Sequence, residues 1–286
     1  MKLSIVILTM GNRPQELARA VESTAPLRSS GAELIVVGNG ADAGPVPSGV
    51  TAVRLAENAG VAGGRNAGVA ASGADVVLFL DDDGWYPEPA VLGEHVAARF
   101  AADPRLAVLS FRVADPDGGP GGRWHVPRLR ASDPERSSVV TTFAGGACAI
   151  RRAAYLEAGG QPETFFFGHE ETDLSWRLMD LGYRLEYDAG AIMCHPAVPN
   201  ARHETWYRTE ARNRVWLARR NLPWPLALVY LADWVLITLV RERSSGSLKA
   251  WFAGFMEGWR LDPGPRRPIK LTTAWQMTKA GRPPIV

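Results

Sequence analysis

Short apolar runs alternate with helical patterns over the first two thirds of the chain. The clearest runs are residues 3–9, 33–37, 51–55, 75–80 and 106–113. Strands that are buried on both faces read as such unbroken runs, and their alternation with helices is typical of a parallel sheet. The pattern therefore predicts an α/β fold that is Rossmann-like, with a mostly parallel sheet flanked by helices.

Helical spacing and turn residues predict the other elements. Pro14 suits the first turn of a helix, and another helix opens in the glycine-rich segment 58–68. Residues 141–150 form a predicted strand that contains a Gly pair. Thr172 or Asp173 is expected to cap a helix that has Leu174, Leu178 and Leu181 on one face. The remaining predictions are a helix over 89–101, a mobile loop or lid over 115–138 and a strand over 183–188.

Composition and charge divide the chain into two unequal parts. Hydrophobic residues make up 46% and charged residues 22%, which is ordinary for a globular protein. The only cysteines are Cys148 and Cys194, and the N-terminus does not read as a secretory signal, so we expect a cytoplasmic protein. Residues 201–286 carry 15 Lys/Arg against 6 Asp/Glu and seven of the ten tryptophans. A basic, Trp-rich end favours a second function with an anionic surface as partner.

Three carboxylates follow the apolar run 75–80 directly. Asp81, Asp82 and Asp83 would repel one another at the end of a strand unless a cation lies among them. Oxygen ligands suit Mg²⁺ or Mn²⁺, which usually also binds oxygens of a substrate phosphate. The motif therefore indicates a seat for a metal and a diphosphate. The simpler alternative is a solvated acidic turn.

Three other features carry candidate chemistry. Arg65 lies in the first turns of the helix that opens in the glycine-rich segment, where a phosphate can bind, although the glycines also suit tight packing. Glu170 and Glu171 lie at the mouth of a helix, where a carboxylate can act as a general base or simply favour the helix dipole. His195 precedes a proline and is either a loop residue or, next to a metal, a candidate ligand.

Several motifs together resemble the inverting, GT-A-fold family 2 glycosyltransferases, especially bacterial rhamnosyl- and galactofuranosyltransferases. The residues that carry the resemblance are 4–9, 58–68, Leu80 to Asp83 as the DXD motif, 167–177 and His195. The resemblance implies a GT-A catalytic domain over 1–220. Residues 1–115 would form its nucleotide-sugar-binding half and 139–220 its acceptor and catalytic half. Residues 221–286 would form a basic, Trp-rich, helical C-terminal appendage.

The resemblance also implies roles for single residues. Glu171 would be the catalytic base, at a position where the family usually has Asp, so its carboxylate would reach about 1.5 Å further. Asp81, Asp83 and His195 would bind Mg²⁺ or Mn²⁺. The implied donor-binding residues are Thr9, Arg13, Asn39, Asn58, Arg65, Asp81, Asp82 and Asp83. The implied acceptor-binding residues are Gly146, Glu170, Asp173 and Trp176.

The implied activity is metal-dependent, inverting transfer of a sugar from dTDP-rhamnose or a UDP-sugar to an acceptor hydroxyl. The acceptor would be a glycan, a lipid-linked molecule or a small molecule, and the reaction would belong to the synthesis of a cell-surface glycan or glycoconjugate. No nucleic-acid-binding module is recognised in the sequence. One alternative is a haloacid-dehalogenase-like phosphatase, whose motif residues 77–84 imitate. Trp85 and the absence of lysine between residues 84 and 249 speak against it. The other alternative is a non-catalytic nucleotide-sugar-binding protein.

The C-terminal region contains one long apolar segment. Residues 225–240 include Asp233 and fall short of the roughly 20 apolar residues that a spanning helix needs. We expect a helix at the membrane interface, which would place the protein peripherally on the inner face of the plasma membrane. The alternatives are a helix buried against the catalytic domain or a homodimer through the C-terminal helices.

Overall fold

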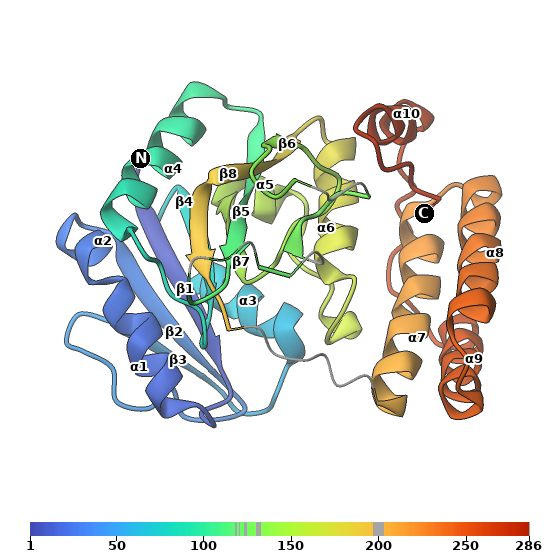
Figure 1. Ribbon diagram of the computed structural model, residues 1–286, viewed down its shortest axis with the longest axis horizontal. Coiled ribbons are helices and arrows are strands. Elements are labelled where there is room, and N and C mark those ends of the chain that lie inside the picture. The colour runs from blue at the N-terminus through green and yellow to red at the C-terminus, as the bar shows by residue number, and fades with distance from the viewer. Residues whose placement is uncertain (118, 120, 123–124, 130–132, 197–202, 286) are drawn as a thin grey trace.

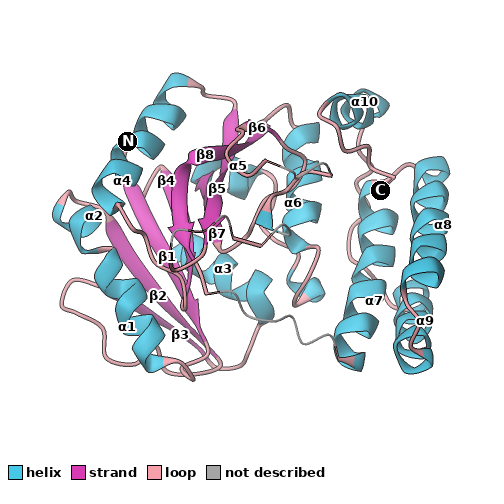
Figure 2. Ribbon diagram, viewed as in Figure 1, coloured by secondary structure: helices cyan, strands magenta, loops and turns pink. Residues whose placement is uncertain are grey.

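The computed structural model describes all residues except 118, 120, 123–124, 130–132, 197–202 and 286. A single sheet runs through the α/β body in the order β3-β2-β1-β4-β7-β5-β8-β6 (Figure 2). The first four strands of that order are parallel, β5 and β8 are parallel, and β7 and β6 pair antiparallel with their neighbours. The bounds are β1 Leu3–Thr9, β2 Glu33–Asn39, β3 Thr51–Leu55, β4 Val76–Asp81, β5 Leu106–Ala114, β6 Ser138–Val139, β7 Ala147–Arg151 and β8 Arg184–Cys194.

Helices cover both faces of the sheet. The side chains of α1, α2 and α4 pack in one core, and those of α3, α5 and α6 pack in another on the opposite face (Figure 1). The bounds are α1 Pro14–Ser23, α2 Ala25–Ser29, α3 Gly60–Ala71, α4 Pro89–Ala102, α5 Arg152–Glu157, the 3₁₀ turn Glu163–Phe165, α6 Glu170–Asp180, α7 Glu204–Asn221, α8 Trp224–Arg241, α9 Ser245–Arg260 and α10 Leu271–Lys279.

The glycines of α3 allow it to lie directly on β1. A Cβ at Gly64 would overlap the side chain of Leu8, and one at Gly68 would overlap Val6. The close-packing interpretation of these two glycines is therefore confirmed. Their small size brings the first turns of α3, including Arg65, to the carboxyl end of β1 and β4.

The C-terminal helices are joined to the α/β body through α7. The Asn213 amide donates to the carbonyl oxygens of Phe165, Phe167 and Gly168 at 2.8–2.9 Å. The core cluster that includes the β1 residue Val6 also includes residues of α7 and α8. Packing is thus continuous from the sheet into the helices shown beside it in Figure 1, and the boundary at residue 220 stays a prediction.

Two sequence predictions of local structure were wrong in their bounds. The strand expected over 141–150 begins at Ala147, because the preceding residues leave the sheet to cross the end of β4. Helix α6 begins at Glu170, with His169 rather than Thr172 or Asp173 at its N-cap. His169 has a positive φ of 70°, which turns the chain sharply enough to start the helix three or four residues early.

Two further expectations met mixed outcomes. Leu174 and Leu178 are buried as expected, whereas Leu181 is 48% exposed because it follows the last turn of α6. Residues 115–138 are largely irregular and end in β6, which pairs with β8. Part of this segment lies outside the described residues, and its role as a lid stays a prediction.

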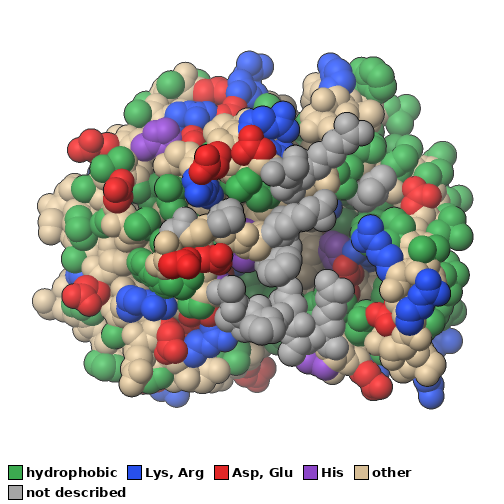
Figure 3. All heavy atoms as spheres, viewed as in Figure 1, with side chains coloured by type: hydrophobic (Ala, Val, Ile, Leu, Met, Phe, Trp, Pro, Cys, Tyr) green, Lys and Arg blue, Asp and Glu red, His purple; other side chains and the backbone are tan. Residues whose placement is uncertain are grey.

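Helix α8 is 18 residues long with a mean hydropathy of 1.5, enough by length and composition to cross a membrane. Only 22% of it is buried against the rest of the protein. Leu228, Leu236 and Val240 are each 59–68% exposed. This face of α8 is therefore not buried against the rest of its own domain, contrary to one of the alternatives. Figure 3 shows hydrophobic side chains along the outer edge of the C-terminal helices.

Candidate functional site

The acidic residues form the turn that ends β4. The Gly84 amide donates to the carbonyl oxygen of Asp81 at 3.0 Å, which closes the turn. The Thr9 hydroxyl, at the end of β1, donates to Asp82 at 2.8 Å. Arg13 forms an ion pair with Asp83 and lies 3.7 Å from Asp82. The carboxylates are thus held by residues that follow the neighbouring parallel strand, as expected at the carboxyl edge of such a sheet.

His195 reaches this turn because β8 ends beside it. Trp85 and Cys194 exchange two backbone hydrogen bonds of 3.0 and 2.9 Å in an antiparallel bridge. The next residue, His195, then places its Nε2 3.0 Å from Asp83 Oδ1. A histidine far away in the sequence therefore becomes a direct neighbour of the acidic turn.

Arg65 links the acidic turn to the mouth of α6. Its guanidinium is buried and lies 2.8 Å from Glu171 Oε1, 3.7 Å from Asp81 and 4.0 Å from Glu170. Burial acts to lower the pKa of Arg65, but the carboxylates, led by Glu171, outweigh it and the pKa is raised. Arg65 therefore stays charged between the two acidic groups.

Two glycines before β7 let the backbone pass between these acids. A Cβ at Gly146 would overlap the carboxylate of Asp81. A Cβ at Gly145 would overlap Glu171 and the guanidinium of Arg65. Close approach of the backbone to these side chains therefore explains the Gly pair.

Asn39 and Asn58 shape the other end of the cleft. The Asn39 amide donates to Asn58 Oδ1 at 2.9 Å, and its oxygen accepts from the Ala59 amide at 2.8 Å. The end of β2 is thus bonded to the loop before α3. These bonds fix the rim of the cleft at this end.

Two adjoining cavities are lined by the residues described above. The larger, of about 640 Å³, is lined by every residue that was predicted to bind the donor and by His195. The smaller, of about 330 Å³, is lined by Gly146, Glu170 and Glu171. Arg65, Asp81 and His195 line both cavities. The acidic turn and Glu171 therefore face one continuous cleft.

The charges in the cleft differ in their proton affinity. Burial acts to raise the pKa of Asp83, but the hydrogen bond with His195 and the charge of Arg13 outweigh it, so the pKa is lowered. The same hydrogen bond raises the pKa of His195. Burial, followed by the neighbouring Glu171, raises the pKa of Glu170 well above its usual range. Glu170 thus favours its neutral form.

Asp173 and Trp176 do not line either of these cavities. The Asp173 carboxylate is fully buried and accepts from Arg177, Arg220 and Asn221 at 2.6–2.9 Å. The acceptor-binding role predicted for Asp173 was therefore wrong, because no oxygen of this carboxylate is left for a ligand. Trp176 is 4% exposed and lines a separate cavity next to the cleft.

Several residues that line the cleft were not predicted from the sequence. Val61, His125, Phe166 and Phe167 belong to one or both cavities. The rings of His125 and His195 lie 6.0 Å apart. A single His or Phe in a loop carries no periodicity or spacing, although Phe166 and Phe167 directly precede the motif around Glu171.

The acidic turn offers a carboxylate and an imidazole to a metal ion. Among the described residues, no three Asp, Glu, His or Cys side chains converge enough to hold an ion by themselves. The three-ligand set Asp81, Asp83 and His195 is thus not formed by the side chains as they stand. Asp83 and His195 are in contact, and this pair fits a divalent ion whose remaining ligands come from a substrate and water.

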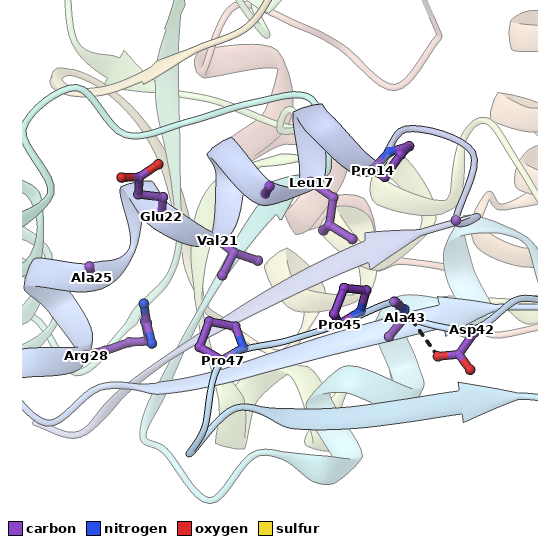
Figure 4. Close-up of a pocket in the computed structure, with 13 residues that line it drawn as sticks. Pro14, Leu17, Val21, Glu22, Ala25, Arg28, Asp42, Ala43, Pro45 and Pro47 are labelled. Carbon is purple, nitrogen blue, oxygen red and sulfur yellow. Dashed lines mark hydrogen bonds between the residues drawn. The ribbon is translucent and has the colours of Figure 1, made fainter.

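A separate cavity of about 340 Å³ lies between α1 and residues 42–47 (Figure 4). Leu17, Val21, Pro45 and Pro47 make its walls mostly apolar. The acidic turn does not contribute to it. We therefore place the candidate site at the acidic cleft.

Comparison with known proteins gives a family match and curated relatives. The family model described as Glycosyl transferase family 2 matches residues 4–159. The pre-mycofactocin glycosyltransferase of Mycobacterium tuberculosis is 28% identical over 271 residues, which is 86% of this chain and 51% of the relative. The chain therefore spans about half the length of the curated relatives it matches.

Solved structures confirm the predicted GT-A fold. A mannosyltransferase from Pyrobaculum calidifontis, in complex with GDP-Man and Mn²⁺, has a TM-score of 0.55 at 16% identity over 98% of this chain and 72% of that chain. Residues 1–349 of S. aureus TarS have a TM-score of 0.61 at 14% identity, over 90% of this chain and 81% of that chain. The rhamnosyl or galactofuranosyl subtype stays a prediction.

Proposed function

Because the chain belongs to glycosyl transferase family 2, we propose that it transfers a sugar from a nucleoside-diphosphate sugar to an acceptor hydroxyl, with inversion at the anomeric carbon. The observation that carries this proposal is the continuous cleft in which Arg65 bridges Asp81 and Glu171. The side of the cleft with Asp81 can hold a diphosphate, and the side with Glu171 can accept a proton. The family match favours transfer over the phosphatase alternative.

Glu171 is the proposed general base. Its Oε1 accepts from Arg65 at 2.8 Å, which fixes the carboxylate toward the smaller cavity. An acceptor hydroxyl there gives its proton to this carboxylate as the oxygen attacks the anomeric carbon from the side opposite the departing diphosphate. The neutral form of Glu170 keeps a second negative charge away from the attacking oxygen.

The acidic turn and Arg65 are the proposed donor site. Arg65 and Arg13 bring positive charge to the cleft, where negative charge develops on the leaving diphosphate. Asp83 and His195 would hold Mg²⁺ or Mn²⁺, which supplies Lewis-acid stabilisation of that charge. Complexes of fold relatives with GDP-Man and Mn²⁺, or with UDP-GlcNAc, support a nucleotide-sugar donor and a divalent ion.

The sugar and its nucleotide follow from the resemblance, and we propose dTDP-rhamnose or a UDP-sugar. A thermal-shift screen of UDP, dTDP and GDP, each with and without Mn²⁺, tests this choice, because a ligand that binds only the folded state raises its stability. We expect the largest shift for UDP or dTDP together with Mn²⁺. A thermal shift with GDP but not with UDP or dTDP would contradict the proposed donor.

The Glu171→Gln variant tests the catalytic role. We expect hydrolysis or transfer of the donor to fall by about 10²–10⁴-fold, because the amide cannot accept the proton. The thermal shift produced by the nucleoside diphosphate should stay unchanged. Glu94→Gln, at an exposed position on α4, is the matched control. Wild-type turnover in Glu171→Gln would remove Glu171 from the base role, and no turnover in the wild type would favour a non-catalytic binding protein.

We also propose that the protein works as a peripheral protein on the inner face of the plasma membrane. The exposed apolar side chains of α8 and the following Arg241 and Arg243 support contact with an anionic surface. A lipid-linked acceptor would then reach the cleft from the same membrane. A homodimer through the C-terminal helices would use the same face and is the competing proposal.

A further inference from the structure

A second polar cavity, of about 240 Å³, lies where the first turn of α6 meets the C-terminal helices. It combines side chains of α6, α7 and α8 with residues that follow α10. Its polar lining includes Thr141, His169, Glu210, Arg214, Trp234 and Arg282. We call it the Arg282 pocket.

The negative charge in the Arg282 pocket, on Glu210, is already paired with residues of the protein. Glu210 forms an ion pair with Arg214, one turn further along α7, and lies 3.0 Å from His169 Nε2. Burial acts to raise the pKa of Glu210, but Arg214 and His169 outweigh it, so the pKa is lowered. Arg214 also donates to the Tyr230 hydroxyl at 2.9 Å. Glu210 therefore neutralises one cation of the pocket.

Arg282 adds a second guanidinium to the pocket. None of the ion pairs among the described residues involves Arg282. Burial lowers its pKa, and the charge of Arg214 acts in the same direction. A cation that is largely removed from water and not paired destabilises the folded state, so an anion bound beside it would offset that cost.

Further donors border the same cavity. Thr141 Oγ1, Arg214 Nε and Trp234 Nε1 are buried and have no hydrogen-bond partner among the described residues. Buried polar groups are normally hydrogen-bonded, so three such atoms in residues that line one cavity favour a ligand with acceptor oxygens there. Guanidinium groups together with N–H and O–H donors match the oxygens of a carboxylate or a phosphate.

The Arg282 pocket shares a wall with the catalytic cleft. His169 and Thr172 line the pocket, while Glu170 and Glu171, between them, line the cleft. Thr142 lines the pocket and bonds to Thr172 at 3.0 Å, and the residues after it, from 143 to 147, line the cleft. A ligand in the pocket therefore contacts residues that directly flank Glu170 and the proposed base Glu171 in the chain.

We infer that the Arg282 pocket binds a carboxylate or phosphate group of the sugar acceptor. The buried ring of Trp176, which also lines it, offers an apolar face to the part of the acceptor that carries this group. The inference rests on the proposed transferase function. It assigns Trp176 to the acceptor through this pocket, and it gives the C-terminal helices a part in choosing the substrate.

Binding of inorganic phosphate tests the pocket without knowledge of the acceptor. The unfolding midpoints of wild type, Arg282→Gln and Trp234→Phe are measured against phosphate at constant ionic strength, once without nucleotide and once saturated with a nucleoside diphosphate and Mg²⁺. We expect phosphate to stabilise the wild type and to bind at least tenfold more weakly to Arg282→Gln. Lys279→Gln, which removes an exposed charge on α10, is the matched control.

Three results of this titration would overturn the anion site. They are equal stabilisation of the wild type and Arg282→Gln, no stabilisation of the wild type, or loss of the effect when the nucleotide is present. The last result would show that phosphate binds at the proposed donor site instead. Because Arg282 has no ion pair among the described residues, its replacement should not unfold the protein. Trp234→Phe keeps an aromatic side chain but removes the indole N–H donor.

Pairs of acceptors that differ by a free carboxylate and its amide test the link to transfer. We expect the wild type to prefer the acid at least tenfold in kcat/KM, and Arg282→Gln to lose this preference through KM. Hydrolysis of the donor without acceptor should be equal in both proteins. Hydrolysis without any preference for the acid would refute the acceptor role and leave the transferase proposal intact, whereas absence of hydrolysis would refute the proposed function itself.

Discussion

Replacing Asp173 with asparagine tests whether this residue joins α6 to α7 rather than binding an acceptor. Asn keeps one oxygen but replaces the other with an NH₂ group, which cannot accept from the donors that now share the carboxylate. Those donors belong to Arg177, Arg220 and Asn221. Both guanidinium groups would stay in a site where Asp173 is 0% exposed, without their counter-charge.

The expected loss of stability follows from this burial. Removing one partner of a buried ion pair destabilises a protein by about 3–5 kcal/mol. With an unfolding entropy of about 2.1 cal mol⁻¹ K⁻¹ per residue, a chain of this length loses roughly 5–8 °C in unfolding midpoint. Circular dichroism at 222 nm during heating measures the shift. Asp233→Asn is the matched control, because Asp233 makes no ion pair among the described residues.

The effect should depend on pH in one direction. Burial acts to raise the pKa of Asp173, but Arg177 and Arg220 outweigh it, and the pKa is lowered. A group with a lowered folded-state pKa stabilises the protein above its unfolded pKa of about 3.9, and this stabilisation is lost as the pH falls further. The difference between wild type and Asp173→Asn should be full at pH 7 and shrink below about pH 4.

The reasoning would be refuted by an unfolding midpoint within about 1 °C of the wild type at pH 7. Weaker binding of the acceptor by such a stable variant would restore the acceptor-binding role of Asp173. A large loss of stability together with normal acceptor affinity in the folded variant would support the structural role.

Two other changes test the cleft and the C-terminal surface. Gly146→Ala should lower donor hydrolysis at least tenfold at 20 °C, because the added Cβ overlaps the Asp81 carboxylate and moves it; Gly246→Ala in α9 is the control. Unchanged hydrolysis in Gly146→Ala would show that Asp81 can move without loss. Leu236→Glu should weaken co-sedimentation with anionic phospholipid vesicles at least fivefold, since it places a charge on the exposed face of α8. Absence of vesicle binding by the wild type, together with a dimeric mass in analytical ultracentrifugation, would favour the homodimer instead.

The local pattern of the sequence was enough to predict most of the sheet and one half of the cleft. Unbroken apolar runs mark β1, β2 and β4, and their carboxyl ends must lie at one edge because the strands are parallel. Thr9, Asn39 and Asp81 to Asp83 were therefore predictable as neighbours. The position of each of these residues depends only on how far it lies from the end of its strand, and that distance can be counted in the sequence.

Other parts were decided only by long-range packing. The antiparallel entry of β7 between β4 and β5, and the early start of α6 at Glu170, depend on contacts that no local pattern encodes. Asp173 looked like a residue of the catalytic motif, and only its burial against Arg220 on α7 showed its structural role. Likewise, Arg282 reads as one more charge in a basic tail, and the folded chain alone places it in a cavity beside α6. The physical reason is that strand and helix periodicity are set by neighbours along the chain, whereas burial and the pairing of charges depend on which distant segments meet.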